Sequence, residues 1–133
     1  MAEAFEETLP RLLLEMGYWG LKRGSLSDAQ RLLKGAQALR PQDPTAGLFE
    51  GMAHFAAGEY ALAEKTYRRV LGACDDDLTR TFLAEALIAQ RRWRDAQALL
   101  AEVLKGSRDK PAVAFARELL NGLAHGVLQR AAT

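Results

Sequence analysis

Apolar residues along this chain recur at intervals of three and four positions, the spacing that places side chains on one face of an α-helix. One stretch illustrates the pattern with the apolar stripe Leu26, Ala29, Leu32, Leu33 and Ala36. Glycines, prolines and short polar stretches interrupt the pattern repeatedly along the chain. The sequence therefore predicts an all-α chain of short helices joined by turns.

Signals for helix ends delimit the first two helices. The first helix is predicted over residues 10–23, with Thr8 as its cap and Gly24 at its end. Ser25 is expected to cap the second helix, because Asp28 follows three residues later in the manner of a capping box.

Similar signals place the later helices. Asp43 and Pro44 predict a cap followed by proline at the first helical position of the third helix. A last helix is expected over about residues 109–130. Its predicted apolar stripe consists of Val113, Ala116, Leu120, Leu123 and Val127.

Small residues mark an internal repeat. A first set of small residues, Gly17, Gly24 and Ala29, is followed 34 residues later by a second set, Gly51, Gly58 and Ala63. An interval of about 34 residues is typical of stacked helix–turn–helix units. A third unit follows at an interval shorter by one position: Phe49, Tyr60, Ala63 and Val70, then Phe82, Trp93, Ala96 and Val103. We expect one domain over residues 1–133, with repeats at about 10–43, 44–76 and 77–108 and a capping helix at about 109–130.

These residues resemble the tetratricopeptide repeat (TPR) over about residues 10–105. In the first repeat the matching residues are Gly17, Ala29, Leu33, Ala36 and Pro41, and in the second they are Gly51, Ala63 and Tyr67. Closely crossing helices need small residues at the crossing point and bulky ones beside it. The resemblance implies a right-handed α-solenoid of three helical hairpins with a C-terminal capping helix.

A narrower resemblance concerns small TPR proteins of bacterial type III secretion systems. It rests on the size of the domain, on Leu12, Leu13 and Leu14 leading into Gly17, and on the segment 29–41. Those proteins are cytoplasmic chaperones or accessories that hold a secreted or needle component before export. The resemblance therefore implies that the partner of this chain is another protein.

Composition agrees with a cytoplasmic protein. The formal net charge of +1 gives no bulk attraction to nucleic acid or to an anionic membrane. The single cysteine suits a reducing compartment. The first residues are acidic rather than basic, unlike a secretory signal, and no apolar run is long enough to span a bilayer.

We find no catalytic, cofactor or metal motif and expect no enzyme. His54 and His125 are the only histidines, and His54 is expected to be packed or to line a groove. The acidic run 75–77 is expected to favour the start of a helix rather than to bind a cation.

In TPRs the first helix of each unit lines a concave groove. The family's groove positions fall on Leu14, Tyr18, Leu21, Leu48, Met52, Phe55, Thr81, Glu85 and Ile88. Because Leu14 and Tyr18 stand where carboxylate-clamping TPRs have Lys and Asn, this groove is expected to take an apolar helix or an extended segment.

The expected function is non-catalytic binding of a protein segment in that groove, as a chaperone-like subunit of a type III secretion system. One alternative is a general TPR scaffold in another complex. Another is a nucleic-acid-associated or enzyme-regulatory module that uses the face carrying Arg68, Arg69, Arg91, Arg92 and Arg94. The sequence leaves open the partner, the shape of the bound segment and whether the free groove is self-occluded. It also leaves open whether the chain forms a homodimer or a heterodimer.

Overall fold

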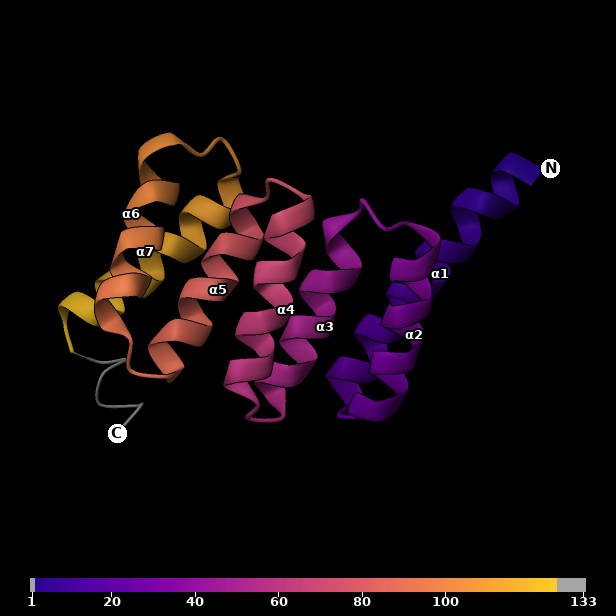
Figure 1. Cartoon of the computed structure of the whole chain (residues 1–133), viewed down its shortest axis with the longest axis horizontal. Helices are drawn as coiled ribbons and strands as arrows, with labels where there is room; N and C mark the ends of the chain where they lie inside the picture. Colours follow the sequence, from indigo (N-terminus) through magenta and orange to yellow (C-terminus); the bar gives the residue numbers. More distant parts are fainter. Residues whose placement is uncertain (1, 127–133) are drawn as a thin grey trace.

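The computed structural model describes residues 2–126, which form seven helices and no strand (Figure 1). The helices are α1 (Ala2–Arg23), α2 (Leu26–Leu39), α3 (Pro44–Ala56), α4 (Tyr60–Ala73), α5 (Asp77–Ala89), α6 (Trp93–Gly106) and α7 (Lys110–Ala124). The pairs α1–α2, α3–α4 and α5–α6 pack as hairpins, and α7 packs against α5 and α6. The predicted all-α solenoid of three hairpins and a final helix is confirmed.

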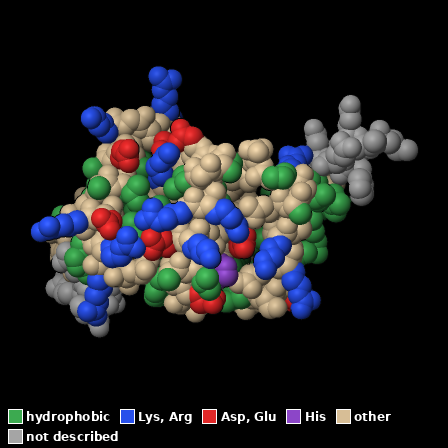
Figure 2. Space-filling model, in the orientation of Figure 1, with side chains coloured by type: hydrophobic (Ala, Val, Ile, Leu, Met, Phe, Trp, Pro, Cys, Tyr) green, Lys and Arg blue, Asp and Glu red, His purple; other side chains and the backbone are tan. Residues whose placement is uncertain are grey.

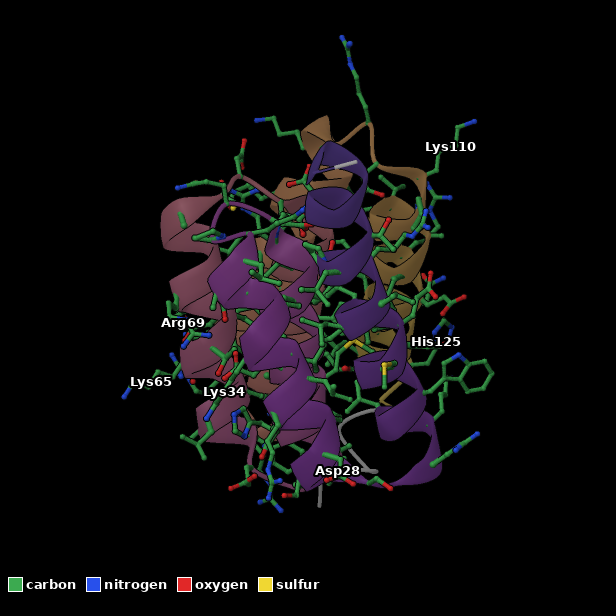
Figure 3. The ribbon with its side chains drawn as sticks, turned by 90° about the vertical axis from the view of Figure 1, so that its right-hand side faces the viewer. Asp28, Lys34, Lys65, Arg69, Lys110 and His125 are labelled. Carbon is green, nitrogen blue, oxygen red and sulfur yellow. The ribbon has the colours of Figure 1, made fainter. Side chains whose placement is uncertain are left out.

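The helices form two layers. Successive odd-numbered helices contact one another, α1 with α3, α3 with α5 and α5 with α7. We call the surface that they form the odd-helix face, and the surface formed by α2, α4 and α6 the even-helix face. Figure 3 views the stack from its N-terminal end, with Lys34, Lys65 and Arg69 on one side and His125 on the other. Any partner therefore meets one of two chemically different surfaces.

The hairpins are held by close crossings at small residues. A Cβ atom at Gly51 would lie 2.1 Å from Cε1 of Tyr67, and one at Gly17 would lie 2.7 Å from Cδ2 of Leu33. Tyr67 and Leu33 are fully buried. In the third hairpin, the fully buried Ala84 occupies the position that Gly51 has in the second. The small residues that define the repeat therefore lie where helix touches helix.

The turns inside the hairpins share one backbone geometry. Gly24 and Gly58 follow α1 and α3 with a φ angle of +79°. The equivalent residue after α5 is Arg91, with a φ angle of +62°. A residue with a Cβ atom is disfavoured there by roughly 1–2 kcal/mol. The repeat geometry is thus kept in the third hairpin even though the glycine is lost.

One prediction about helix starts is wrong, and a second is confirmed only in part. Helix α1 begins at Ala2, so Thr8 lies inside the helix and is not its cap. Pro10 lies in the interior of the helix and is buried, at a position where it cannot donate a backbone hydrogen bond. Ser25 is the N-cap residue of α2 as predicted, but its side chain makes no capping bond, and only its backbone oxygen accepts from the Ala29 amide.

Other caps are confirmed. The Asp43 carboxylate accepts from the Thr45 amide at 2.9 Å, and Asp109 accepts from the Ala112 amide at 3.2 Å. Asp76, within the predicted helix-starting acidic run, accepts from the Thr79 amide at 2.9 Å. These bonds satisfy amides that the helix itself leaves unpaired.

Helix α7 covers the C-terminal end of the core. Its buried residues are Ala112, Ala116, Leu119 and Leu123. The predicted stripe named Val113 and Leu120, which are half-buried, instead of the buried Ala112 and Leu119. The buried face is shifted by one residue at these two positions. The helix ends at Ala124, and Gly126 has a φ angle of +71°. Val127 and the rest of the predicted span to residue 130 lie outside the described residues.

The crossing at Gly51 leads to a stability prediction. Gly51→Ala should lower the free energy of unfolding by about 1–3 kcal/mol, because the new methyl group overlaps the Tyr67 ring. Gly72, also in a helix, has open space where a Cβ atom would stand, with no atom within 4 Å. Gly72→Ala should therefore raise stability by up to about 1 kcal/mol. Urea denaturation of both variants checks this, and equal effects would contradict the close crossing.

Candidate functional site

Aromatic rings follow the odd-helix face. Phe49, Phe82 and Phe115 stand at equivalent repeat positions on α3, α5 and α7. The centroids of Phe82 and Phe115 are 5.0 Å apart in an edge-on contact. Tyr18 of α1 contacts Phe49 with a centroid distance of 5.6 Å. All three phenylalanines are half-buried, so this row belongs partly to the core and partly to the surface.

A cavity of about 320 Å³ opens at the α1–α3 end of this face. It is lined by Arg11, Leu14, Glu15, Tyr18, Trp19 and Phe49. Trp19 is 59% exposed, which is unusual for a large apolar side chain. Aromatic and aliphatic walls with few polar groups are typical of ligand-binding surfaces.

The charges around this cavity are balanced. The Arg11 guanidinium lies 4.0 Å from the Glu15 carboxylate. The Lys22 ammonium lies 5.4 Å from the centroid of the Tyr18 ring, within reach of a cation–π interaction. This end of the odd-helix face therefore offers mainly apolar contact.

The predicted groove residues divide into two groups. Six are half-buried and present some surface: Leu14, Tyr18, Leu21, Met52, Phe55 and Glu85. The other three, Leu48, Thr81 and Ile88, are buried, and their assignment to the groove surface is corrected. Thr81 and Ile88 belong to α5, which neighbours α3, α4, α6 and α7 and so has most of its surface covered. The Thr81 hydroxyl donates to the Asp77 carbonyl within the helix.

Sequence reasoning missed several residues of this face. Trp19, Phe49, Phe82 and Phe115 were not assigned to it. The regular spacing of the phenylalanines is visible in the sequence and could have indicated them. Trp19 carries no such signal, because the equivalent residue of the second repeat is the buried Ala53.

Glu85 is the unusual polar group of the odd-helix face. It is half-buried, and among residues 2–126 no hydrogen bond or ion pair involves its carboxylate. Burial raises the pKa of Glu85 from its ordinary value of 4.5 to about 7. The Tyr67 hydroxyl is buried without a described partner, and burial together with the charge of Glu85 raises the pKa of Tyr67.

The even-helix face carries many arginines, but carboxylates hold several of them. Arg68 and Arg92 both contact Glu64 at 2.9 Å, and Arg69 contacts the buried Glu50 at 2.9 Å. Burial of Glu64 opposes ionisation, but hydrogen bonds from its neighbours, including both arginines, lower its pKa. Figure 2 shows Asp and Glu side chains mixed among Lys and Arg on the visible face. This surface is therefore a network of ion pairs rather than a uniform basic patch.

His54 belongs to a different surface from the aromatic row. Its Nδ1 atom lies 3.4 Å from a Glu59 carboxylate oxygen. It lines a second cavity of about 330 Å³. The residues around that cavity are Glu50, His54, Leu62, Lys65, Thr66 and Arg69. The histidine is thus partly packed, and it is not grouped with the predicted groove residues.

The raised pKa of Glu85 predicts a pH dependence. Between pH 4.5 and about 7 the native state holds a proton that the unfolded chain has released, so stability falls as the pH rises through this window. Glu85→Gln removes this effect. The free energy of unfolding of the variant minus that of the wild type should therefore be larger at pH 8 than at pH 5. Urea denaturation at both pH values checks this. An identical difference at pH 5 and pH 8 would show that Glu85 titrates normally.

Several solved structures resemble most of the chain. The Yersinia enterocolitica type III secretion translocator chaperone SycD matches with a TM-score of 0.76 and 18% identity, over 87% of this chain and 90% of SycD. SycD in complex with a peptide of the translocator YopD matches with a TM-score of 0.72 and 21% identity, over 91% and 90%. The first TPR of Spaghetti (RPAP3), bound to the HSP90 peptide SRMEEVD, matches with a TM-score of 0.69 and 18% identity, over 88% and 94%.

At these identities the likeness establishes the fold. No curated protein sequence matches the chain. Within residues 2–126, no helix is long and apolar enough to cross a membrane. Residues 21–77 match the tetratricopeptide-repeat family. This match and the similar solved structures together show a tetratricopeptide-like stack of helical hairpins, a fold that typically serves as a scaffold for protein interactions.

Proposed function

We propose that this protein binds a segment of another protein on its odd-helix face, as a chaperone-like or accessory subunit of a type III secretion system. The observation that carries the proposal is the apolar cavity of about 320 Å³ between α1 and α3, with Trp19 59% exposed at its wall. Tryptophan is among the residues that most often dominate the binding energy of an interface. A segment inserted there would cover this side chain.

The form of the site favours a short apolar segment. Phe49 of the aromatic row lines the cavity, and the half-buried Met52 adds a flexible side chain that adapts to different contacts. An amphipathic helix or an extended segment places apolar side chains at regular intervals and fits such a row. We infer that residues Leu14, Tyr18, Leu21, Met52, Phe55 and Glu85 of the predicted groove take part.

The link to type III secretion is supported by the similarity to SycD over most of both chains. Two of the similar structures hold peptides, one from the translocator YopD and one from HSP90. We propose a comparable peptide-holding role here, in the cytoplasm before export, on a single domain over residues 1–133. The starts of α3, α5 and α7 support repeat boundaries near residues 44, 77 and 110.

The alternatives receive different support. A general TPR scaffold would use the same odd-helix face and differs only in the partner. A nucleic-acid-associated or regulatory module would use the arginines of the even-helix face. Since Arg68, Arg69 and Arg92 are engaged by Glu50 and Glu64, no observation favours that module.

The experiment is co-purification of the full chain from its native cell, followed by identification of the retained protein and titration with it. Trp19→Ala should weaken binding by about 2 kcal/mol or more without unfolding the protein, because the side chain is mostly exposed. Leu39→Ala is a matched control, since Leu39 is 49% exposed at the end of α2.

Two results would contradict the proposal. Equal effects of the Trp19 and Leu39 variants would remove the α1–α3 cavity from the site. A retained protein that is neither secreted nor part of a secretion apparatus would leave the binding site standing but overturn the type III assignment.

A further inference from the structure

We infer that the segment bound on the odd-helix face carries a lysine or arginine beside its apolar residues, and that Glu85 and Glu118 receive this cation. The inference rests on the proposed function, because it names the chemistry of the segment that this face accepts. It assigns the two ends of the face different roles. The α1–α3 end takes apolar side chains, and the α5–α7 end takes positive charge.

The register of α5 and α7 places the two carboxylates at equivalent positions of neighbouring helices. The rings of Phe82 and Phe115 contact each other at a centroid distance of 5.0 Å. Glu85 and Glu118 each follow one of these rings by three residues, which places them one turn further on the same side of the helix. The axes of packed helices lie about 8–10 Å apart. One flexible basic side chain of a bound segment is long enough to reach the carboxylates on both helices.

Neither carboxylate has a described counter-charge. Among the side chains of residues 8–126, none forms a hydrogen bond or ion pair with Glu85 or Glu118. Glu15, Glu50 and Glu64 are each matched with an arginine. Glu118 is exposed, whereas Glu85 has lost much of its hydration by burial, which raises its pKa to about 7. A cation from a bound segment would supply the stabilisation that burial has removed.

The distribution of charge distinguishes the two ends of the odd-helix face. At the α1–α3 end, Arg11 offsets Glu15, and Lys22 lies over the Tyr18 ring, so that end has no unbalanced carboxylate among the described residues. At the α5–α7 end, two unpaired carboxylates would repel an acidic segment and attract a basic one. Charge complementarity therefore favours a segment with apolar residues followed or preceded by a basic residue.

The test is selection of random dodecapeptides displayed on phage against the full-length protein. The wild type is compared with the double variant Glu85→Gln, Glu118→Gln. The variant Glu102→Gln is the matched control, because Glu102 is exposed on α6. Melting curves confirm that all three proteins are folded, and removal of a half-buried carboxylate at residue 85 is not expected to impair folding.

Wild type and control should enrich peptides with Lys or Arg next to apolar residues, and the double variant should keep only the apolar preference. One enriched peptide and its counterpart with methionine at the basic position are then titrated by calorimetry. The loss of the cation should weaken binding to the wild type about tenfold, and to the double variant less than about twofold.

The outcomes separate this inference from the proposed function. Apolar peptides without basic enrichment in the wild type, or basic enrichment that persists in the double variant, overturn the inference alone. If the wild type enriches no peptide at all, the proposed peptide-binding function fails and the inference fails with it.

Discussion

The fold depends on how closely the two helices of each hairpin approach. At the central hairpin, the Tyr67 ring occupies the space where a side chain on residue 51 would stand. This contact buries one large ring completely and brings α3 against α4. The Tyr67 ring also packs against Phe82 of α5, with 6.3 Å between the ring centroids. The same ring therefore links the positions of α3 and α5. The separation of α3 and α5 on the odd-helix face thus depends on a ring buried inside the central hairpin.

The same contact explains the polar groups left without partners. A tyrosine ring fills the crossing better than a smaller residue, but its hydroxyl ends in the core and finds no described hydrogen-bond partner. Such a buried group costs about 1–3 kcal/mol. Glu85 lies close enough for its charge to act on that hydroxyl, and both groups have raised pKa values. Packing of the central hairpin therefore takes precedence over polar pairing next to the odd-helix face.

The sequence predicted most of the architecture because its strongest signals are steric. Small residues that recur once in each repeat mark helix crossings, and Gly24 and Gly58 mark turns that require a positive φ angle. The starts of α1 and α2 were harder to predict from these signals. Local rules place Pro10 at the start of a helix, yet α1 begins at Ala2 and Pro10 lies buried in its interior. Ser25 looks like a cap, although its side chain makes no capping bond.

The candidate site was less predictable, since exposure depends on the neighbours that a repeat happens to have. Leu14 and Thr81 occupy the same position of the first and third repeats, but only Thr81 is buried, because α5 lies between other helices while α1 lies at the end. A binding surface in a short solenoid is therefore not a uniform stripe. The end at α1 exposes apolar side chains such as Trp19, whereas the end at α5 and α7 carries the half-buried Glu85 and the exposed Glu118. The asymmetry follows from the small number of repeats, and it is the basis for proposing that apolar and basic residues of a bound segment meet different ends of the face.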